Sequence, residues 1–320
     1  MRATARAQPN IALIKYWGKS NVGKNLPAVG SLSLTLDSLM TQMTVDFDAS
    51  LRQDELVVND ESAAMMLPRV TTCLDNLLGR ERPRASVLSE CNFPIAAGLA
   101  SSASSFAALV VAASTAAGGN LDRLALARAA GATSGSAARS LYGGFVELGT
   151  SRENIDVGCI LDAAEWPLQV IVAVTAKSQK PISSGDAMKL SANTSPFYEN
   201  WVQQQDSDLR VAREAVANRD FAALAGVSEH NCLKMHSVMW TSRPSVVYWN
   251  AATLASMETV RQLQRDGVPV FFTIDAGPQL KAVCEAAVAT QVQEALRHTT
   301  GVVTTMQSNL GQGARLMSES

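Results

Sequence analysis

The sequence predicts a mixed chain of strands and helices that is divided into two parts near residue 166. In the first part, residues 31–37 and 41–48 alternate polar and apolar side chains with the two-residue period of a half-buried strand. Residues 168–174 form an apolar, β-rich run, after which the pattern is mostly that of long helices. A chain of 320 residues is long enough for two medium-sized domains. We therefore expect domains at residues 1–166 and 167–320.

The composition is that of an ordinary globular protein, with 47% hydrophobic and 18% charged residues and a formal net charge of −2. This near-balanced charge argues against a general nucleic-acid or membrane surface, so an anionic ligand must be met by local groups. The N-terminus lacks the apolar core of a signal peptide, and no apolar run approaches membrane-spanning length. The five cysteines are scattered and lack C-x-x-C spacing, which predicts a reducing cytoplasm and no zinc site.

Local patterns predict the elements of the first part. We expect residues 31–37 and 41–48 to be neighbouring strands of an antiparallel sheet. The other expected elements are a short strand starting at Asn10, a turn at Asn59-Asp60, a helix over residues 61–78 ended by Gly79, a strand over residues 85–91, and a helix over residues 121–130 capped by Asn120.

The most distinctive stretch is residues 92–105 (NFPIAAGLASSASS), which predicts a loop that becomes a helix. Pro94 ends the preceding strand, and Gly98 lets the backbone bend closely around a small ligand. Small side chains leave the amides at a helix start uncovered, where an anion is favoured, and Ser101 and Ser102 add hydroxyls for a phosphate or Mg²⁺. We interpret the stretch as a triphosphate cradle; a small-residue helix packed closely against its neighbours fits it equally well. Neither a Walker A motif nor G-x-G-x-x-G is present.

Residues 10–19 (NIALIKYWGK) begin as an apolar strand and end with two lysines and two aromatic residues. One interpretation places a lysine over a bound phosphate, with Tyr16 and Trp17 shaping the pocket. The alternative is a strand end whose lysines point to solvent.

Residues 134–140 (SGSAARS) resemble another helix start, with Ser136 and Arg139 on one helical face. That face offers hydroxyls and a planar guanidinium to a carboxylate or phosphate. The alternative is a serine cap followed by a surface arginine.

In the second part, Ser183 and Ser184 begin another predicted helix, where each serine is either a cap or a ligand-binding group. Further helices are expected over residues 207–216, 221–239 and 246–263, with a loop over residues 177–181 and a last strand over residues 302–306. Residues 267–274 predict a strand that delivers Asp275 onto Ala276-Gly277-Pro278. Asp275 is either a helix cap, with Pro278 in the first turn, or a general base.

In their order along the chain, these motifs resemble the diphosphomevalonate decarboxylase family of the GHMP kinase superfamily. The resemblance is carried by NIALIKYWGK, SLSLTLD (residues 31–37), NFPIAAGLASSAS, SGSAARSLYGG (residues 134–144), residues 183–188 and TIDAGP (residues 273–278), which span nearly the whole chain. It implies an α+β, two-domain GHMP-kinase-type fold with the active site in the cleft between the domains.

The resemblance also implies a reaction in the mevalonate pathway of isoprenoid biosynthesis. ATP and Mg²⁺ phosphorylate the tertiary 3-hydroxyl of mevalonate 5-diphosphate, and loss of phosphate and carbon dioxide gives isopentenyl diphosphate. A tertiary hydroxide leaves badly, whereas phosphate leaves well, and decarboxylation supplies the electrons of the new double bond. No electron-sink cofactor is needed. The resemblance further implies a cytoplasmic homodimer.

By resemblance, Asp275 orients or deprotonates the 3-hydroxyl. Lys19 stabilises the phosphate in transit, and Arg139 holds the substrate carboxylate or diphosphate. Ser134 and Ser136 bind diphosphate oxygens, and Tyr16 lines the substrate pocket. The ATP loop comprises Gly98, Leu99, Ala100, Ser101 and Ser102, whose serines also face the metal; the lid over nucleotide and substrate contains Ser183, Ser184 and Met188.

Other activities remain open at this point. Relatives in the superfamily phosphorylate mevalonate at the 3-hydroxyl or decarboxylate a monophosphate. A non-catalytic sensor on the same scaffold and a helical interaction protein without a ligand are further alternatives. Asp275, Lys19 and Arg139 together favour the full decarboxylase, because a sensor does not need them.

Overall fold

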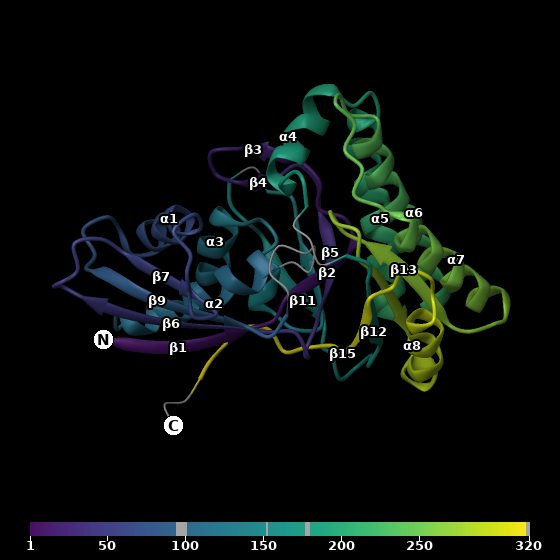
Figure 1. Cartoon of the computed structure of the whole chain (residues 1–320). Coiled ribbons are helices and arrows are strands. Elements are labelled where there is room, and N and C mark those ends of the chain that lie inside the picture. The colour runs from purple at the N-terminus through teal and green to yellow at the C-terminus, as the bar shows by residue number, and fades with distance from the viewer. Residues whose placement is uncertain (94–100, 152, 177–179, 318–320) are drawn as a thin grey trace.

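The computed structural model describes residues 1–93, 101–151, 153–176 and 180–317. It is an α+β molecule in which the first half of the chain lies at one end and the long helices of the second half lie at the other (Figure 1). Within the described residues, no helix is both long and apolar enough to cross a bilayer.

The first half is built on a six-stranded sheet with the order β16-β1-β6-β9-β7-β8. Small residues of α2 pack against β1 and β6, and α1 and α3 pack beside α2. The elements of this layer are β1 (Arg2–Ala7), β6 (Thr41–Asp48), β7 (Glu55–Val58), β8 (Glu61–Ser62), β9 (Arg84–Cys91), β16 (Arg315–Leu316), α1 (Leu67–Leu78), α2 (Ser101–Ala116) and α3 (Arg123–Thr133).

Two antiparallel four-stranded sheets form the middle and the far end of the molecule, with the orders β11-β10-β5-β2 and β13-β14-β12-β15. They share a hydrophobic core that includes Leu13, Leu32, Val170 and Phe271. The strands are β2 (Asn10–Ile14), β5 (Ser31–Thr35), β10 (Phe145–Leu148), β11 (Val157–Leu161), β12 (Gln169–Val174), β13 (Val270–Ile274), β14 (Leu280–Cys284) and β15 (Thr304–Asn309), with β3 (Lys19–Asn21) and β4 (Leu26–Pro27) as a separate pair.

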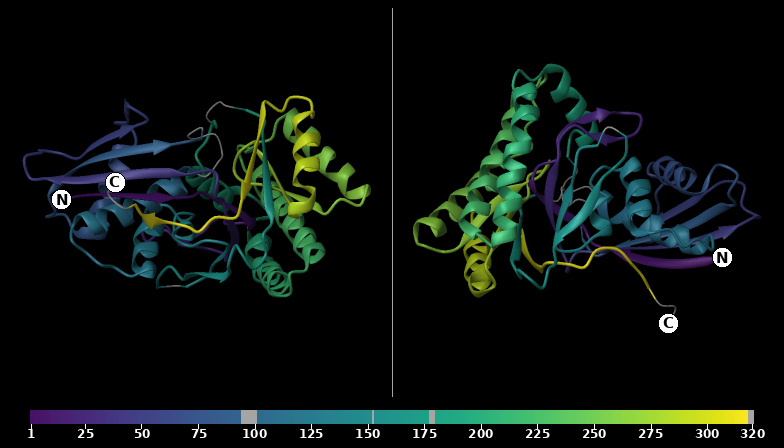
Figure 2. Two further views of the ribbon diagram at one scale, coloured as in Figure 1. Left: turned by 90° about the horizontal axis from the view of Figure 1, so that it is seen from below. Right: turned by 180° about the vertical axis from the view of Figure 1, so that it is seen from behind.

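Helices of the second half cover the last sheet: α6 and α7 pack on β13, and α8 packs on β12 and β15. They are α4 (Ser184–Thr194), α5 (Tyr198–Asn218), α6 (Phe221–Trp240), α7 (Ala251–Arg265) and α8 (Ala289–Arg297). The chain then returns to the first sheet, where β16 pairs with β1, so both termini lie at the same end of the molecule (Figure 2).

Residues 31–37 and 41–48 do form strands, but the prediction that they are neighbours is wrong. β5 pairs with β2 and β10, whereas β6 pairs with β1 and β9 in another sheet. The residues between β5 and β6 contact the C-terminal part of the chain instead: the Asp37 carboxylate accepts from the Asn309 backbone N–H at 3.1 Å. β5 and β6 therefore do not form a hairpin with each other.

Several helix boundaries differ from the predicted ones. α1 begins at Leu67, with a proline in its first turn, because residues 61 and 62 pair with β7; it ends at Gly79 as predicted. Asp122 rather than Asn120 caps α3, accepting from the Ala125 N–H at 2.7 Å. Asn250 caps α7, so residues 246–250 precede the helix.

Candidate functional site

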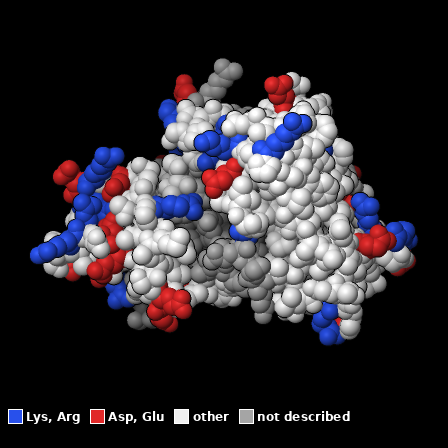
Figure 3. Space-filling model, turned by 45° about the horizontal axis from the view of Figure 1, so that its top comes forward, with Lys and Arg blue, Asp and Glu red and all other residues white. Residues whose placement is uncertain are grey.

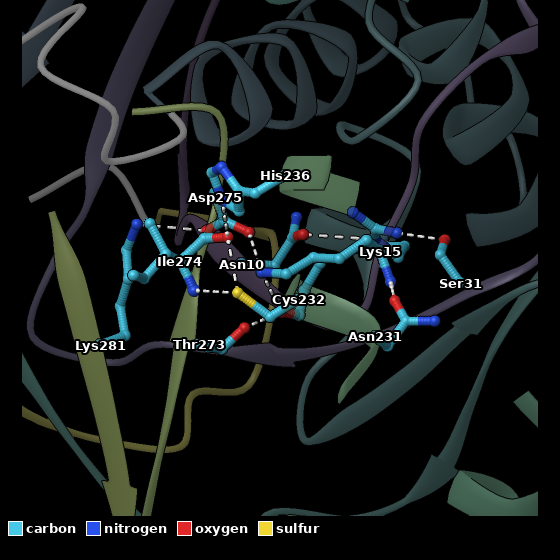
Figure 4. A network of polar contacts seen from close by, with 12 residues as sticks. Asn10, Lys15, Ser31, Asn231, Cys232, His236, Thr273, Ile274, Asp275 and Lys281 are labelled. Atoms are coloured by element: carbon cyan, nitrogen blue, oxygen red, sulfur yellow. Dashed lines mark hydrogen bonds and ion pairs between the residues drawn. The ribbon is translucent and has the colours of Figure 1, made fainter. Parts of the chain in front are cut away.

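Asp275 lies at the end of β13 between two buried lysines (Figure 4). Its Oδ1 accepts from Lys15 Nζ at 2.8 Å, and its Oδ2 is 3.3 Å from Lys281 Nζ. Lys281 is on β14 and is in register with Thr273, two residues before Asp275. Both lysine side chains are 1% exposed, whereas the Asp275 side chain is 23% exposed. Asp275 is therefore the most exposed side chain of the cluster, although its Oδ2 is buried.

The surroundings of Asp275 keep it ionised. Burial raises the pKa of this carboxyl, but the two lysine ammonium groups outweigh burial and hold the pKa well below its usual range. Burial lowers the pKa of Lys281, which Asp275 opposes. No helix follows Asp275, so the helix-cap interpretation of this residue is wrong.

A third lysine approaches the same cluster from the segment before α4. Lys180 Nζ donates to Ser184 Oγ at 2.6 Å and to the Ala276 carbonyl at 3.2 Å. Burial and repulsion from Lys281 lower the pKa of Lys180 to about 8, against the attraction of Asp275. The site thus combines one carboxylate with several cations, an arrangement suited to a substrate that carries several negative charges.

Arg139 is buried and lies in the short 3₁₀ segment Arg139–Leu141. Its Nε donates to Asn10 Oδ1 at 3.2 Å, and its guanidinium also donates to Ser31 Oγ. Burial lowers the pKa of Arg139 to about 10, with Asp275 and Tyr16 opposing this effect. The surface-arginine alternative is wrong, because the guanidinium faces the interior of the site.

The segment containing Arg139 is not the helix start that its serines suggested. Residues 135–138 form turns, and the Ser134 backbone N–H instead caps the end of α3 by donating to the Ala130 carbonyl. The Ser136 carbonyl accepts from Asn10 Nδ2 at 3.0 Å. Ser136 and Arg139 therefore meet at Asn10 rather than through helical spacing.

The Tyr16 side chain packs against this segment at Gly135. Its hydroxyl is buried and has no hydrogen-bond partner among the residues that the structure describes. Burial raises the pKa of Tyr16 to about 12, although Arg139 opposes this effect. Gly135 lies directly against the ring, so a Cβ at that position would overlap the Tyr16 hydroxyl. The Tyr16 hydroxyl therefore keeps unused hydrogen-bonding capacity in a buried position.

Lys19 is the first residue of β3. Burial and repulsion from Arg69 lower the pKa of Lys19, and attraction to Asp186 opposes this effect. Figure 3 shows a hollow between the two halves of the chain, with Lys and Arg side chains at its margins.

The predicted lid residues begin α4. Ser183 is its N-cap, accepting from the Asp186 N–H at 3.1 Å, and Ser184 accepts from Lys180. Met188 belongs to a buried cluster with Trp17 and Trp201.

The predicted ATP loop is described only in part. Gly98, Leu99 and Ala100 lie outside the described residues. α2 starts at Ser101, which is buried, and Ser102 is exposed in its first turn, which has no acidic side chain. The body of α2 is the tightly packed small-residue helix of the alternative interpretation. In the described part of the chain, no group of three or more His, Cys, Asp or Glu side chains is arranged to hold a metal ion.

Sequence reasoning missed Lys15, Lys180 and Lys281. Lys15 is the other lysine of KYWGK, but the resemblance gave a role in phosphate transfer to Lys19 alone. Lys281 had a detectable signal, because it is a charged residue inside the apolar run LKAVC, which starts one residue after TIDAGP.

Comparison with known proteins gives consistent matches over nearly the whole chain. Residues 7–159 match the diphosphomevalonate decarboxylase-like N-terminal domain, and residues 170–318 match the mevalonate 5-diphosphate decarboxylase C-terminal domain. The chain is 32% identical to the diphosphomevalonate decarboxylase of Candida albicans, over 86% of this chain and 82% of the relative. It is 34% identical to diphosphomevalonate decarboxylase mvd1 of Aspergillus fumigatus, over 87% and 75%.

Solved structures of mevalonate diphosphate decarboxylases are similar in fold over nearly the whole chain. The mevalonate diphosphate decarboxylase of Staphylococcus aureus is 34% identical, with a TM-score of 0.92 over 99% of this chain and 98% of that one. A complex of MDDEF with MVAPP, AMPPCP and magnesium is 36% identical, with a TM-score of 0.92 over 100% and 99%.

Proposed function

Because this chain belongs to the diphosphomevalonate decarboxylase family, we propose that it converts mevalonate 5-diphosphate and ATP into isopentenyl diphosphate, ADP, phosphate and carbon dioxide. The observation that carries this proposal is the partly exposed Asp275 side chain, whose carboxylate is held ionised between Lys15 and Lys281 and interacts electrostatically with buried Arg139. It provides an acceptor for a substrate hydroxyl and cations for the substrate's anionic ends.

The chemistry follows from this arrangement. Asp275 accepts a hydrogen bond from the 3-hydroxyl and orients it toward the γ-phosphate of ATP. It takes the hydroxyl proton as the new O–P bond forms, while the bond between the γ-phosphorus and the β,γ-bridging oxygen breaks and ADP leaves with its electron pair. The phosphate then leaves C3 with the electron pair of the C–O bond. The C1–C2 bond breaks to release carbon dioxide, and its electron pair becomes the C2=C3 double bond. Atoms and charges balance without a redox cofactor.

The cations assist where negative charge is transferred or held. Lys15 and Lys281 fix the Asp275 carboxylate, and Arg139 binds the substrate carboxylate or diphosphate, as a planar guanidinium does well. Lys19 stabilises the transferred phosphoryl group from the α4 side. The remaining proposed contacts are Ser134 and Ser136 with diphosphate oxygens, Tyr16 in the substrate pocket, and Ser183, Ser184 and Met188 in a lid.

The start of α2 is suited to bind the phosphates of ATP. Ser102 is exposed there, the helix N-terminus attracts anions, and the first turn has no acidic side chain that would repel them. Mg²⁺ would neutralise the phosphates there, with the Ser101 and Ser102 hydroxyls beside it and Gly98, Leu99 and Ala100 completing the loop. We also propose domains at residues 1–166 and 167–320, a cytoplasmic location and a homodimer, which family membership supports.

The Gly135→Ala variant tests the pocket around Tyr16. The added Cβ would displace the Tyr16 hydroxyl, and misplacement of a substrate-positioning group by about 1 Å costs on the order of 100-fold in rate. We expect kcat/KM for mevalonate 5-diphosphate to fall by about that factor. Gly158→Ala is the matched control, because a Cβ at Gly158 meets nothing within 4 Å. Equal kinetics for Gly135→Ala and Gly158→Ala would remove Tyr16 from the substrate pocket.

The function itself is tested by ADP release with mevalonate, its 5-phosphate and its 5-diphosphate at equal concentration. We expect turnover with the diphosphate, since several cations gather at the site. Faster turnover of the monophosphate would identify a phosphomevalonate decarboxylase, and turnover of mevalonate alone a 3-kinase. Binding without any ADP release would identify a ligand sensor.

A further inference from the structure

Two side-chain amides from the second half of the chain, Asn231 and Gln205, hold both backbone polar groups of Lys15; Figure 4 shows the contact with Asn231. The Lys15 N–H donates to Asn231 Oδ1 of α6 at 2.8 Å, and Gln205 Nε2 of α5 donates to the Lys15 carbonyl at 2.7 Å. Asn231 Nδ2 in turn donates to Gln205 Oε1 at 2.9 Å, which closes the ring of hydrogen bonds. Both amide residues are completely buried.

The ring is itself anchored at its outer side. Asn231 Nδ2 also donates to Asp208 Oδ2 at 2.6 Å, and this carboxylate is paired with Lys234 at 2.5 Å. A buried amide with so many partners has one orientation only, because rotating it would leave donors facing donors. Residue 15 lies one position beyond β2 and therefore owes its backbone position to this ring rather than to a strand partner.

The same helix holds the strand that carries Asp275. β13 is at the edge of its sheet, and α6 side chains meet the backbone groups on that edge. The Ile274 N–H donates to Cys232 Sγ at 3.2 Å, and His236 Nε2 is 3.2 Å from the Ile274 carbonyl oxygen. Two neighbouring residues of α6 thus hold the backbone at both members of the Lys15–Asp275 ion pair. Asn231 binds the backbone of Lys15, and Cys232 binds that of Ile274, next to Asp275.

We propose that Asn231 and Gln205 are positioning residues that set the contact between the Lys15 ammonium group and the Asp275 carboxylate. This inference rests on the role of Asp275 in the proposed function. Without the ring, Lys15 loses its backbone anchors, and its Nζ no longer stays both at the Ala12 carbonyl, 2.8 Å away, and at Asp275. Asp275 then turns or protonates more easily.

The pKa of Asp275 reports the position of Lys15, because nearby charges determine it. The titratable groups that face it are Lys15 after β2, Lys281 on β14, Lys180 before α4, Arg139 in the 3₁₀ segment, and Cys232 and His236 on α6. Of these, Lys15 is the group that the amide ring holds. Moving Lys15 away raises the pKa of Asp275, so the ionised form is lost at a higher pH as the solution is acidified.

The test compares Asn231→Ala and Gln205→Ala with wild type and with Leu224→Ala, a buried α6 truncation whose apolar side chain takes no part in the ring of hydrogen bonds. We expect kcat to fall about 100-fold in both amide variants, with the KM for ATP changed less than threefold. The acid limb of the kcat profile and the ¹³C titration of the Asp275 carboxyl should both move to higher pH. Leu224→Ala should lower the melting temperature and leave both curves unchanged.

The inference is overturned if the Asp275 titration is the same in wild type and both amide variants, or if Leu224→Ala moves it equally. If Asn231→Ala does not fold, Gln205→Ala decides the matter, since it removes one anchor and keeps the other. The carboxyl titration does not depend on turnover. A wild-type protein that releases no carbon dioxide would therefore contradict the proposed function, while the titration still supports or refutes the positioning role.

Discussion

Asp275→Asn is expected to abolish turnover while leaving substrate binding close to normal. The amide keeps the size of the side chain but cannot take the proton of the 3-hydroxyl, and loss of a general base typically costs about 10²–10⁴-fold. It also leaves Lys15 and Lys281 facing a neutral group. Single-turnover product formation should fall by about 10²–10⁴-fold, while the calorimetric Kd for mevalonate 5-diphosphate changes little.

Asp54→Asn is the matched control for this variant. Asp54 is also a buried carboxylate paired with a cation, Arg82 at 2.6 Å, but it lies in the first sheet layer. Removing one partner of such a buried pair costs about 3–5 kcal/mol of stability. Asp54→Asn should therefore melt at a lower temperature and keep its kcat. A wild-type rate in Asp275→Asn would exclude Asp275 from the chemistry.

Arg139→Lys is expected to lower kcat/KM for mevalonate 5-diphosphate by about 100-fold or more. A lysine keeps the positive charge but cannot bond Asn10 and Ser31 and present a planar fork to an anion at the same time. The buried ammonium group is also harder to keep charged than a guanidinium. Steady-state kinetics with varied mevalonate 5-diphosphate measures the change.

The comparison variant is Arg213→Lys, which also removes a guanidinium fork. Arg213 bonds both oxygens of Glu147 on an exposed surface of α5. Arg213→Lys should change the stability by only about 0–1 kcal/mol, because the ion pair is exposed. We expect its kcat/KM to equal that of wild type. If Arg139→Lys and Arg213→Lys had the same kinetics, the guanidinium geometry at Arg139 would have no role in binding.

Local patterns were enough to locate several parts of the site. The apolar run before Asp275 predicted β13, and the serine at the start of α4 predicted its cap. Both depend on neighbouring residues only. The contact of Lys15 with Asp275 could not be found in this way, because Lys15 lies far from Asp275 in the sequence and its position depends on amides of α5 and α6.

The errors have the same origin. Arg139 was expected on a helical face with Ser136, but contacts with Asn10 and Ser31 fix it in a 3₁₀ segment instead. Likewise, β5 and β6 look like a hairpin locally, and the contact of Asp37 with Asn309 separates them. Sequence periodicity reports burial and local conformation, whereas sheet membership and ion pairs depend on segments far apart in the chain.

The most direct test of the account is the ratio of carbon dioxide to ADP released from mevalonate 5-diphosphate labelled with ¹⁴C at its carboxyl carbon. We predict one labelled carbon dioxide for each ADP, because the leaving 3-phosphate and the departing carboxylate are linked through one double bond. ADP released without labelled carbon dioxide would contradict the account and show a kinase that stops at the 3-phosphate.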